Sequence, residues 1–338
     1  MTATRPSSLA AARVRSLAPG AAVLVAVAVA AHEVAAVVPG VGMLVVAILA
    51  GAVIANVAGT PGWAEPGIGL HTLALEVGIV LLGAQLTLGE VVASGPTVVA
   101  LTLGVVVLGV LLGETLARRV FSLPERTGSL LAAGASVCGV SAVAAVARAV
   151  DADESTVAYA AGTVLLFDAV TIVAFPLAGN ALGLGQKPFG VWAGLSMFST
   201  GPVAAATFAY GEVAGRWGTL TKLVRNAFIG AVAIGYSVHY ARGDGTDLRA
   251  LWTEYPKFLV GFLLVVGATS AGALSPGGTA LLAATNDWLF ALAFAGLGFD
   301  IRIQEMRTAG FRPVALVLVQ FVVVSALALV AVTFVVGA

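Results

Sequence analysis

Residues 127–149 read TGSLLAAGASVCGVSAVAAVARA, an apolar run of membrane-spanning length that small and polar residues interrupt near its centre. A helix needs roughly 20 mostly apolar residues to cross about 30 Å of hydrocarbon. The interruption contains Ser136, Cys138, Gly139 and Ser141. A break inside a membrane leaves backbone N–H and C=O groups unpaired, which is tolerated only where the break faces protein or a wet cavity. The stretch therefore predicts a discontinuous membrane helix.

A second run, residues 188–211, is interrupted at a similar depth by Ser199, Thr200 and Gly201, followed by Pro202. Proline removes a backbone donor and crowds the preceding turn. The N-terminus of a half-helix at such a break offers free N–H groups and a partial positive charge, which suit an anion. The alternative for both runs is close helix packing through small residues. Broken helices are typical of secondary transporters, so we expect these residues to bind substrate.

The whole chain has the composition of a membrane protein. Of its 338 residues, 59% are hydrophobic and 10% are charged, and the mean hydropathy is +1.03. Soluble domains have about 45–50% apolar and about 25% charged residues. The single cysteine excludes a disulfide scaffold, and the zero formal charge gives no reason to expect a nucleic-acid partner. The sequence contains no zinc-ligand spacing and no nucleotide-binding motif, so we expect neither an enzyme nor a metal or cofactor.

Apolar runs predict an all-α polytopic protein with about eleven transmembrane helices. The whole chain, residues 1–338, is expected to form one transporter domain, in which residues 1–17 are a cytoplasmic tail. A signal-peptidase site at Ala28-Val29-Ala30 is the alternative for the first helix, which we expect to be retained. Strands are excluded because the runs are long, rich in Ala and Leu, and without polar alternation. The eleven runs are 18–38, 40–58, 70–88, 96–117, 127–149, 155–178, 188–211, 217–240, 257–274, 279–299 and 313–336.

The basic residues orient these helices, because Lys and Arg concentrate on the cytoplasmic side. With the N-terminus inside, 13 of the 17 basic residues lie in inner segments. Arg148 and Arg216 lie in outer loops, and Lys222 and Arg225 lie within a span. The sequence thus predicts a multi-pass protein of the cell membrane, with its N-terminus cytoplasmic and its C-terminus outside.

The third and tenth runs resemble each other at an offset of 215 residues. The two helices lie seven positions apart in the order of spans, an odd number, so they cross the membrane in opposite directions. Inverted repeats are common in secondary transporters, whose sites lie at the repeat interface near the midplane; chance similarity between apolar helices is the alternative. The matched pairs are Leu82 and Leu297, Gly83 and Gly298, Leu86 and Ile301, Leu88 and Ile303, Glu90 and Glu305, and Gly95 and Gly310.

Ionisable groups inside a membrane are costly and are therefore candidates for function. Asp168 in the sixth run and Asp287 in the tenth could couple transport to protons, as could Glu76 in the third. None of the three histidines is expected to take part in this coupling.

The eighth run carries Lys222, Arg225 and Asn226, which share one helix face at spacings of three and four residues. For Lys222 the alternative to anion binding is extension of the ammonium group to the membrane surface, which the sequence slightly favours. For Arg225 the alternative is a structural ion pair with Asp168 or Asp287.

Several stretches resemble the YeiH family of sulfate exporters, over residues 39 to the C-terminus. They are SVCGVSAVAAVA, TVLLFDAVTIVAFPLAG, GIVLLGAQLTL, TLTKLVRN and GLGFDIRIQEMRTAGFRP. The family is related to the bile acid:sodium symporters, so the resemblance implies two inverted bundles and a pair of crossed, broken helices. It also implies that Ser136, Cys138, Gly139 and Ser141 line the first crossing and that Lys222 and Arg225 form a basic pair. Phe198–Pro202 lacks the acidic group and the amide usual in the family, and Asp168 replaces a small residue.

The sequence therefore predicts a secondary active transporter that moves a small anion by alternating access, with a proton, sodium or a counter-anion as the coupled ion. Sulfate export is the substrate and direction that the resemblance implies. A sodium-coupled organic-anion symporter is the alternative within transport. A passive anion channel or a membrane scaffold is the alternative of another class. The expected partners are the small anion, the coupling ion, the lipid bilayer and, through small-residue helix surfaces, a second copy of the chain.

Overall fold

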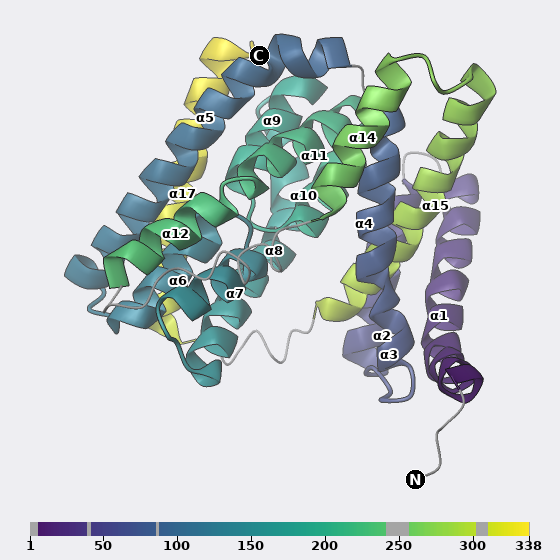
Figure 1. Cartoon of the computed structure of the whole chain (residues 1–338), viewed down its shortest axis with the longest axis horizontal. Coiled ribbons are helices and arrows are strands. Elements are labelled where there is room, and N and C mark those ends of the chain that lie inside the picture. The colour runs from purple at the N-terminus through teal and green to yellow at the C-terminus, as the bar shows by residue number, and fades with distance from the viewer. Residues whose placement is uncertain (1–5, 39–41, 86–87, 241–256, 302–309, 338) are drawn as a thin grey trace. The chain divides into compact units, whose positions relative to one another are not determined.

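A computed structural model describes residues 6–38, 42–85, 88–240, 257–301 and 310–337, and every regular element in these ranges is helical (Figure 1). This confirms the predicted all-α class. By length and composition, six helices among the described residues are able to cross a membrane: Arg15–Val37, Glu65–Gln85, Gly95–Val120, Glu154–Ala181, Gly277–Asp300 and Phe311–Val335. The remaining predicted spans consist of shorter helices, so the structure does not establish the number eleven.

The chain forms two compact units. The first contains residues 1–87 and 260–304, and the second contains residues 88–259 and 305–338. The helices of the first unit are α1 (Pro6–Val37), α2 (Met43–Val57), α3 (Glu65–Ile68), α4 (Leu70–Leu82), the short 3-10 helix η1 (Gly83–Gln85), α14 (Phe258–Ser270) and α15 (Pro276–Asp300).

In the first unit, α15 packs against both α2 and α4. A Cβ on Gly51 of α2 would lie 2.2 Å from the Ala295 carbonyl oxygen, so only glycine allows this approach. His71 at the start of α4 lies 3.2 Å from Asp300 at the end of α15, and the two helices run in opposite directions (Figure 1). The predicted inverted repeat requires the same opposition. The repeat itself stays a prediction, because much of its second copy, 302–309, lies outside the described residues.

The second unit holds the interrupted runs. Its helices are α5 (Leu88–Thr115) with a π-helical end (Leu116–Val120), α6 (Glu125–Ser136), α7 (Val140–Ala149), α8 (Glu154–Ala181), α9 (Gln186–Ser196), α10 (Thr200–Tyr210), α11 (Glu212–Asn226), α12 (Ile229–Tyr240) and α17 (Phe311–Val335).

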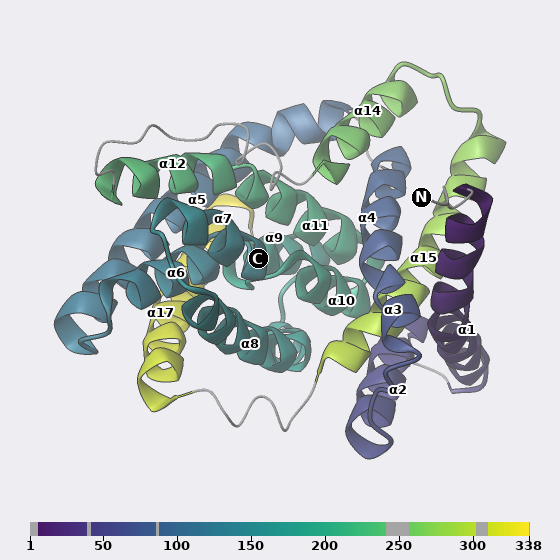
Figure 2. The same ribbon diagram turned by 60° about the horizontal axis from the view of Figure 1, so that its bottom comes forward.

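The run 127–149 forms a helical hairpin, which we call the first hairpin. Its arms, α6 and α7, lie side by side in both views (Figures 1 and 2). A Cβ on Gly134 would lie 2.8 Å from Val143, which shows how closely the antiparallel arms pack. At the base, Arg126 Nη2 donates to Asp151 Oδ2 over 3.3 Å. The chain therefore leaves the hairpin at the end where it entered.

The run 188–211 forms the second hairpin, from α9 and α10. The rings of Phe189 near the start of α9 and Tyr210 at the end of α10 stack with their centroids 3.8 Å apart. The Tyr210 hydroxyl also donates to the Leu184 carbonyl, just before α9. Pro202 lies in the first turn of α10, where the N–H that proline lacks has no intrahelical partner. This hairpin too returns to the end where it began.

The two hairpins enter the second unit from opposite ends. Helix α8 connects the base of the first to the base of the second, and its 28 residues extend over roughly 42 Å. The sequence predicts that each interrupted run crosses the membrane, and this prediction is wrong. The crossed, broken helices that the resemblance implies are likewise replaced by hairpins whose tips meet beside the middle of α8.

The predicted span 217–240 consists of two helices, because α11 ends at Asn226 and α12 begins at Ile229. Helix α11 packs against α9 and α10, whereas α12 packs against α7. The predicted start at residue 217 is also late, since α11 begins at Glu212. The break between α11 and α12 lies next to the hairpin tips, so three interruptions meet at one place.

Candidate functional site

The tips of the two hairpins touch each other. Gly139 adopts a φ of 66°, a conformation that side chains rarely permit, and a Cβ there would lie 2.2 Å from the Ser199 Oγ. Only glycine satisfies both the conformation and the contact. The first tip consists of Val137, Cys138 and Gly139, and the second consists of Met197, Phe198 and Ser199.

Lys222 of α11 is fully buried between the tips. Its Nζ donates to the Val137 carbonyl over 2.7 Å and to the Met197 carbonyl over 3.1 Å. The preference for extension of this ammonium group to the membrane surface is therefore wrong. The burial is sustained because each carbonyl lies at the C-terminal end of a half-helix, where the helix dipole is negative.

Arg225, one turn further along α11, is also fully buried. Its Nε donates to Ser136 O over 2.8 Å, its Nη2 to Ala135 O over 2.8 Å and its Nη1 to Met197 O over 2.7 Å. The guanidinium group thus satisfies carbonyls of both hairpins rather than pairing with Asp168, one of the partners expected from the sequence. Together the two cations hold the C-terminal ends of α6 and α9 against α11.

Asp168 lies halfway along α8 and is buried. Its Oδ1 accepts a hydrogen bond from the Ser199 backbone N–H over 3.0 Å, so the carboxylate caps the N-terminus of α10. The Ser199 hydroxyl is in contact with the same carboxylate, while the Asp168 Oδ2 is buried without a hydrogen-bond partner. Lys222 and Arg225 are the basic groups that act electrostatically on it.

Asn226 and Ser136 complete the buried surroundings of the tips. Asn226 Nδ2 donates to the Thr200 Oγ1 over 3.0 Å, while its Oδ1 has no partner. The Ser136 hydroxyl donates to the Ala132 carbonyl of its own helix and accepts from Gln320 Nε2 of α17 over 3.0 Å. Ser136 is therefore a packing contact in this structure, and its carbonyl rather than its hydroxyl meets Arg225.

The N-terminal turn of α7 is the more open part of the site. Cys138 is buried, with the Ser141 hydroxyl and the Ala142 N–H in contact with its thiol. Ser141 is exposed, and Ser199 and Thr200 across the tips are partly exposed, whereas Gly201 is buried. A small molecule in this unit would meet these three hydroxyls before it met Lys222 or Arg225.

An aromatic cluster fixes the second tip. The Phe198 ring lies 5.9 Å from that of Phe167 on α8 and 5.5 Å from that of Phe321 on α17. Such aromatic pairs pack favourably at these distances. The tip is therefore anchored on its apolar side by rings and on its polar side by Asp168 and Asn226.

The structure does not bring every predicted residue into this site. Glu76 on α4 is partly buried and Asp287 on α15 is exposed, and both belong to the first unit. Sequence reasoning missed Gln320, which also donates to the Gly109 carbonyl over 3.0 Å. A signal for it exists, since Gln320 is a lone amide in an otherwise apolar run.

The comparisons with known proteins give one consistent result. The family model described as "Conserved hypothetical protein 698" matches residues 19–317. A "UPF0324 membrane protein" of Nitratidesulfovibrio vulgaris is 30% identical over 272 residues, which is 78% of this chain and 75% of the relative. "UPF0324 membrane protein Atu0671" of Agrobacterium fabrum is 31% identical over 264 residues, which covers 78% and 76%.

A third relative, "UPF0324 membrane protein GSU2818" of Geobacter sulfurreducens, is 31% identical over 274 residues, which covers 80% of this chain and 84% of the relative. No solved structure matches the chain. The match covers both hairpins, α8 and α11, the elements that build the site. The chain therefore belongs to the UPF0324 membrane proteins, the YeiH family that its motifs resemble.

Proposed function

We propose that this protein is a secondary active transporter of a small anion, with sulfate as the first candidate and export as the direction that its family suggests. The observation that carries the proposal is the meeting of two oppositely entering hairpins beside two fully buried cations. Half-helix ends at membrane depth are typical of transporter binding sites. The cytoplasmic N-terminus and the outer C-terminus remain part of the proposal.

Charge at the tips favours an anion. Lys222 and Arg225 neutralise the carbonyl ends of α6 and α9, and ionised Asp168 removes one of the two positive charges. The formal charge of this buried set is then +1, to which the N-terminus of α7 adds the partial positive charge of its dipole. We propose that Ser141, Ser199 and Thr200 contact the anion. Lys222 and Arg225 attract it through their electrostatic field and hold the two hairpin tips in place.

Asp168 is the proposed coupling group. Protonation of this carboxyl would raise the charge of the buried set by one, so proton binding and anion binding favour each other. The orphaned Oδ2 is the oxygen that would take the proton. This sign of coupling supports movement of proton and anion in the same direction, with the imposed gradients determining which direction that is. Sodium in place of the proton is the alternative, and Glu76 and Asp287 are the carboxylates of the first unit proposed to take part.

The test is flux of radiolabelled sulfate into proteoliposomes under imposed pH or sodium gradients. The wild type is compared with the double variant Ser199→Ala and Thr200→Val. Thr333→Val is the matched control, because the Thr333 hydroxyl bonds to the Val330 carbonyl of its own helix. We expect gradient-driven flux in the wild type and the control, and its loss in the double variant.

Three results would change the proposal. Sulfate flux without any gradient dependence would indicate a channel. Absence of sulfate flux under every gradient, in folded protein, would remove sulfate and direct the same assay to organic anions. Equal flux in the double variant and the wild type would remove the hairpin tips from the substrate path.

A further inference from the structure

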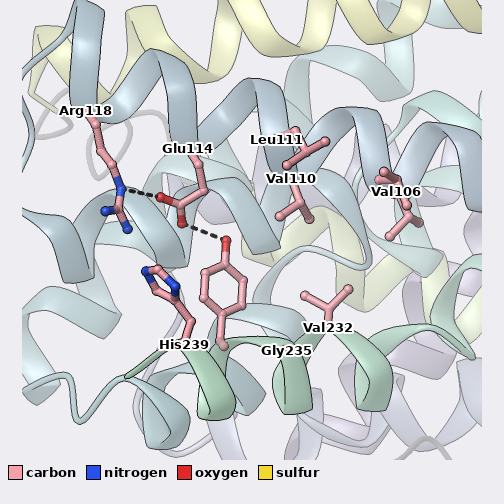
Figure 3. A pocket seen from close by; sticks show the side chains of 10 residues that line it. Val106, Val110, Leu111, Glu114, Arg118, Val232, Gly235 and His239 are labelled. Carbon is pink, nitrogen blue, oxygen red and sulfur yellow. Dashed lines mark hydrogen bonds and ion pairs between the residues drawn. The ribbon is translucent and has the colours of Figure 1, made fainter. Parts of the chain in front are cut away.

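A cavity of about 400 Å³ lies between α5 and α12 in the second unit (Figure 3). Its apolar wall is formed by Val106, Val107, Val110 and Leu111 of α5 together with Val232 of α12. The exposed fractions of Val107 and Leu111 are 49% and 62%, so the cavity is bordered by the outer surface of a membrane helix. Lipid is the medium that such an apolar surface suits on a helix of membrane-spanning length.

One end of the cavity is polar. Glu114 Oε2 accepts from Arg118 Nε over 2.8 Å, and its Oε1 accepts from the Tyr236 hydroxyl over 2.8 Å. Figure 3 shows both contacts, with the His239 ring beside them. Glu114 Oε1 also accepts from the Ser129 hydroxyl over 2.6 Å. The carboxylate is therefore saturated by donors within the protein.

The basic groups at this end remain partly accessible. Arg118 is 36% exposed, with Glu125 3.6 Å from its Nη1 as a second acidic neighbour. Arg119 follows it in the chain and is exposed, as is His239. Arg118 Nη2 donates to the Tyr240 hydroxyl over 3.3 Å, a neutral partner at a partly exposed position. A phosphate oxygen is the acceptor that would replace this hydroxyl, because the guanidinium group matches phosphate geometry.

The length of the cavity matches one leaflet of a bilayer. The candidate span Gly95–Val120 places Val106 near its middle and Arg118 near its end. The twelve residues between them rise about 18 Å along the helix, close to half of the roughly 30 Å hydrocarbon thickness. The apolar wall thus runs from mid-membrane to the interface, and the polar end lies where lipid headgroups lie.

We infer that this cavity binds one phospholipid of the surrounding leaflet, with an acyl chain between α5 and α12 and the phosphate beside Arg118 and His239. The inference is independent of the transported substrate. Because α12 packs on α7, the bound chain supports the outer side of the first hairpin.

Gly235 offers a way to close the cavity. It lines the cavity, and a Cβ at this position would meet no atom within 4 Å, so a larger side chain is tolerated by the fold and projects into the free space. Gly230 lies on the same helix with equally open surroundings but does not line the cavity. Gly235→Leu and Gly230→Leu are therefore a matched pair.

The experiment is photolabelling of the full-length protein in nanodiscs with a phospholipid that carries a diazirine in its acyl chain, followed by peptide mass spectrometry. We expect adducts on α5 and α12 in the wild type and in Gly230→Leu. In Gly235→Leu this labelling falls about tenfold, the change that exclusion of about two methylenes produces. Val107→Trp, which fills the cavity from α5, replaces Gly235→Leu if the latter does not fold.

Equal labelling of the two glycine variants would overturn the inference. So would absence of wild-type adducts together with cross-links from residues 241–256 to α12, because the chain itself would then fill the cavity. The role given to the phosphate would be refuted by two results together. A fatty acid that carries a diazirine would label α5 and α12 as strongly as the phospholipid does, and Arg118→Gln would not decrease the labelling by the phospholipid.

Discussion

Replacement of Arg225 by methionine tests whether the buried cations hold the hairpin tips together. Methionine fills most of the space of arginine and adapts to irregular gaps, so the change removes the donors without leaving a large cavity. The Met197 carbonyl keeps Lys222 as its donor, while the carbonyls of Ala135 and Ser136 lose theirs. The variant therefore isolates the contacts between α11 and the first hairpin.

Each buried carbonyl that loses its donor costs about 1–3 kcal/mol, so two of them lower the free energy of unfolding by about 2–6 kcal/mol. The matched control is Arg216→Met on the same helix, where Arg216 is partly exposed and its Nη2 donates to Glu212 Oε1 over 2.6 Å. A surface pair of this kind contributes about 0.3–0.5 kcal/mol.

Equilibrium unfolding in mixed micelles measures both variants, first without and then with sulfate. The structural role predicts that Arg225→Met is much less stable than Arg216→Met already in sulfate-free buffer. If Arg225 instead reserved its donors for the anion, the two variants would be equally stable without sulfate and would differ only in its presence. That outcome would refute the reasoning.

Three further predictions concern the tip, the coupling group and the start of α8. Gly139→Ala should lower the free energy of unfolding by more than backbone strain alone, which costs about 1–3 kcal/mol, because its Cβ also meets Ser199. Gly183 has a similar φ of 64° but open surroundings, so Gly183→Ala should show the strain alone when both variants are compared in thermal melts. Asp168→Asn should preserve the cap on Ser199 and abolish the response of anion flux to an imposed pH gradient in proteoliposomes, and an unchanged response would exclude this carboxyl as the coupling group. Hydrogen bonds from Ser155 and Thr156 lower the pKa of Asp153 to about 2. A carboxyl whose pKa is lowered in the folded state stabilises the fold above its ordinary pKa, and this contribution is lost as the pH falls through about 2. The stability difference between the wild type and Asp153→Ala, measured by unfolding, should therefore disappear between about pH 4 and pH 2.

The sequence located both interruptions to within a few residues but did not reveal that the chain turns back at them. Hydropathy counts apolar residues and carries no direction, so a run of 23 residues looks alike as a span and as a hairpin. The basic residues did not expose the error either. With two hairpins in place of two spans, Arg148 moves to the inner side and Lys187 to the outer side, and 13 of the 17 basic residues still lie inside.

The shared face of Lys222, Arg225 and Asn226 was predictable from their spacing, whereas their partners were not. Backbone carbonyls carry no signature in the sequence, and only the meeting of two half-helix ends supplies enough of them to bury two cations. The break between α11 and α12 was missed for a similar reason. No glycine or proline marks Ala227 and Phe228, and tertiary packing determines where α11 ends.

The most direct test of the two-hairpin arrangement is the sidedness of cysteine labelling in intact and inverted vesicles. Cys138→Ala removes the one native cysteine, after which Glu125→Cys, Glu154→Cys, Leu182→Cys and Glu212→Cys place single thiols at exposed positions beside the hairpin bases. The structure predicts that positions 125 and 154 react from one face of the membrane and positions 182 and 212 from the other. Reaction of 125 and 154 from opposite faces would show that residues 127–149 cross the membrane and would contradict the hairpin account.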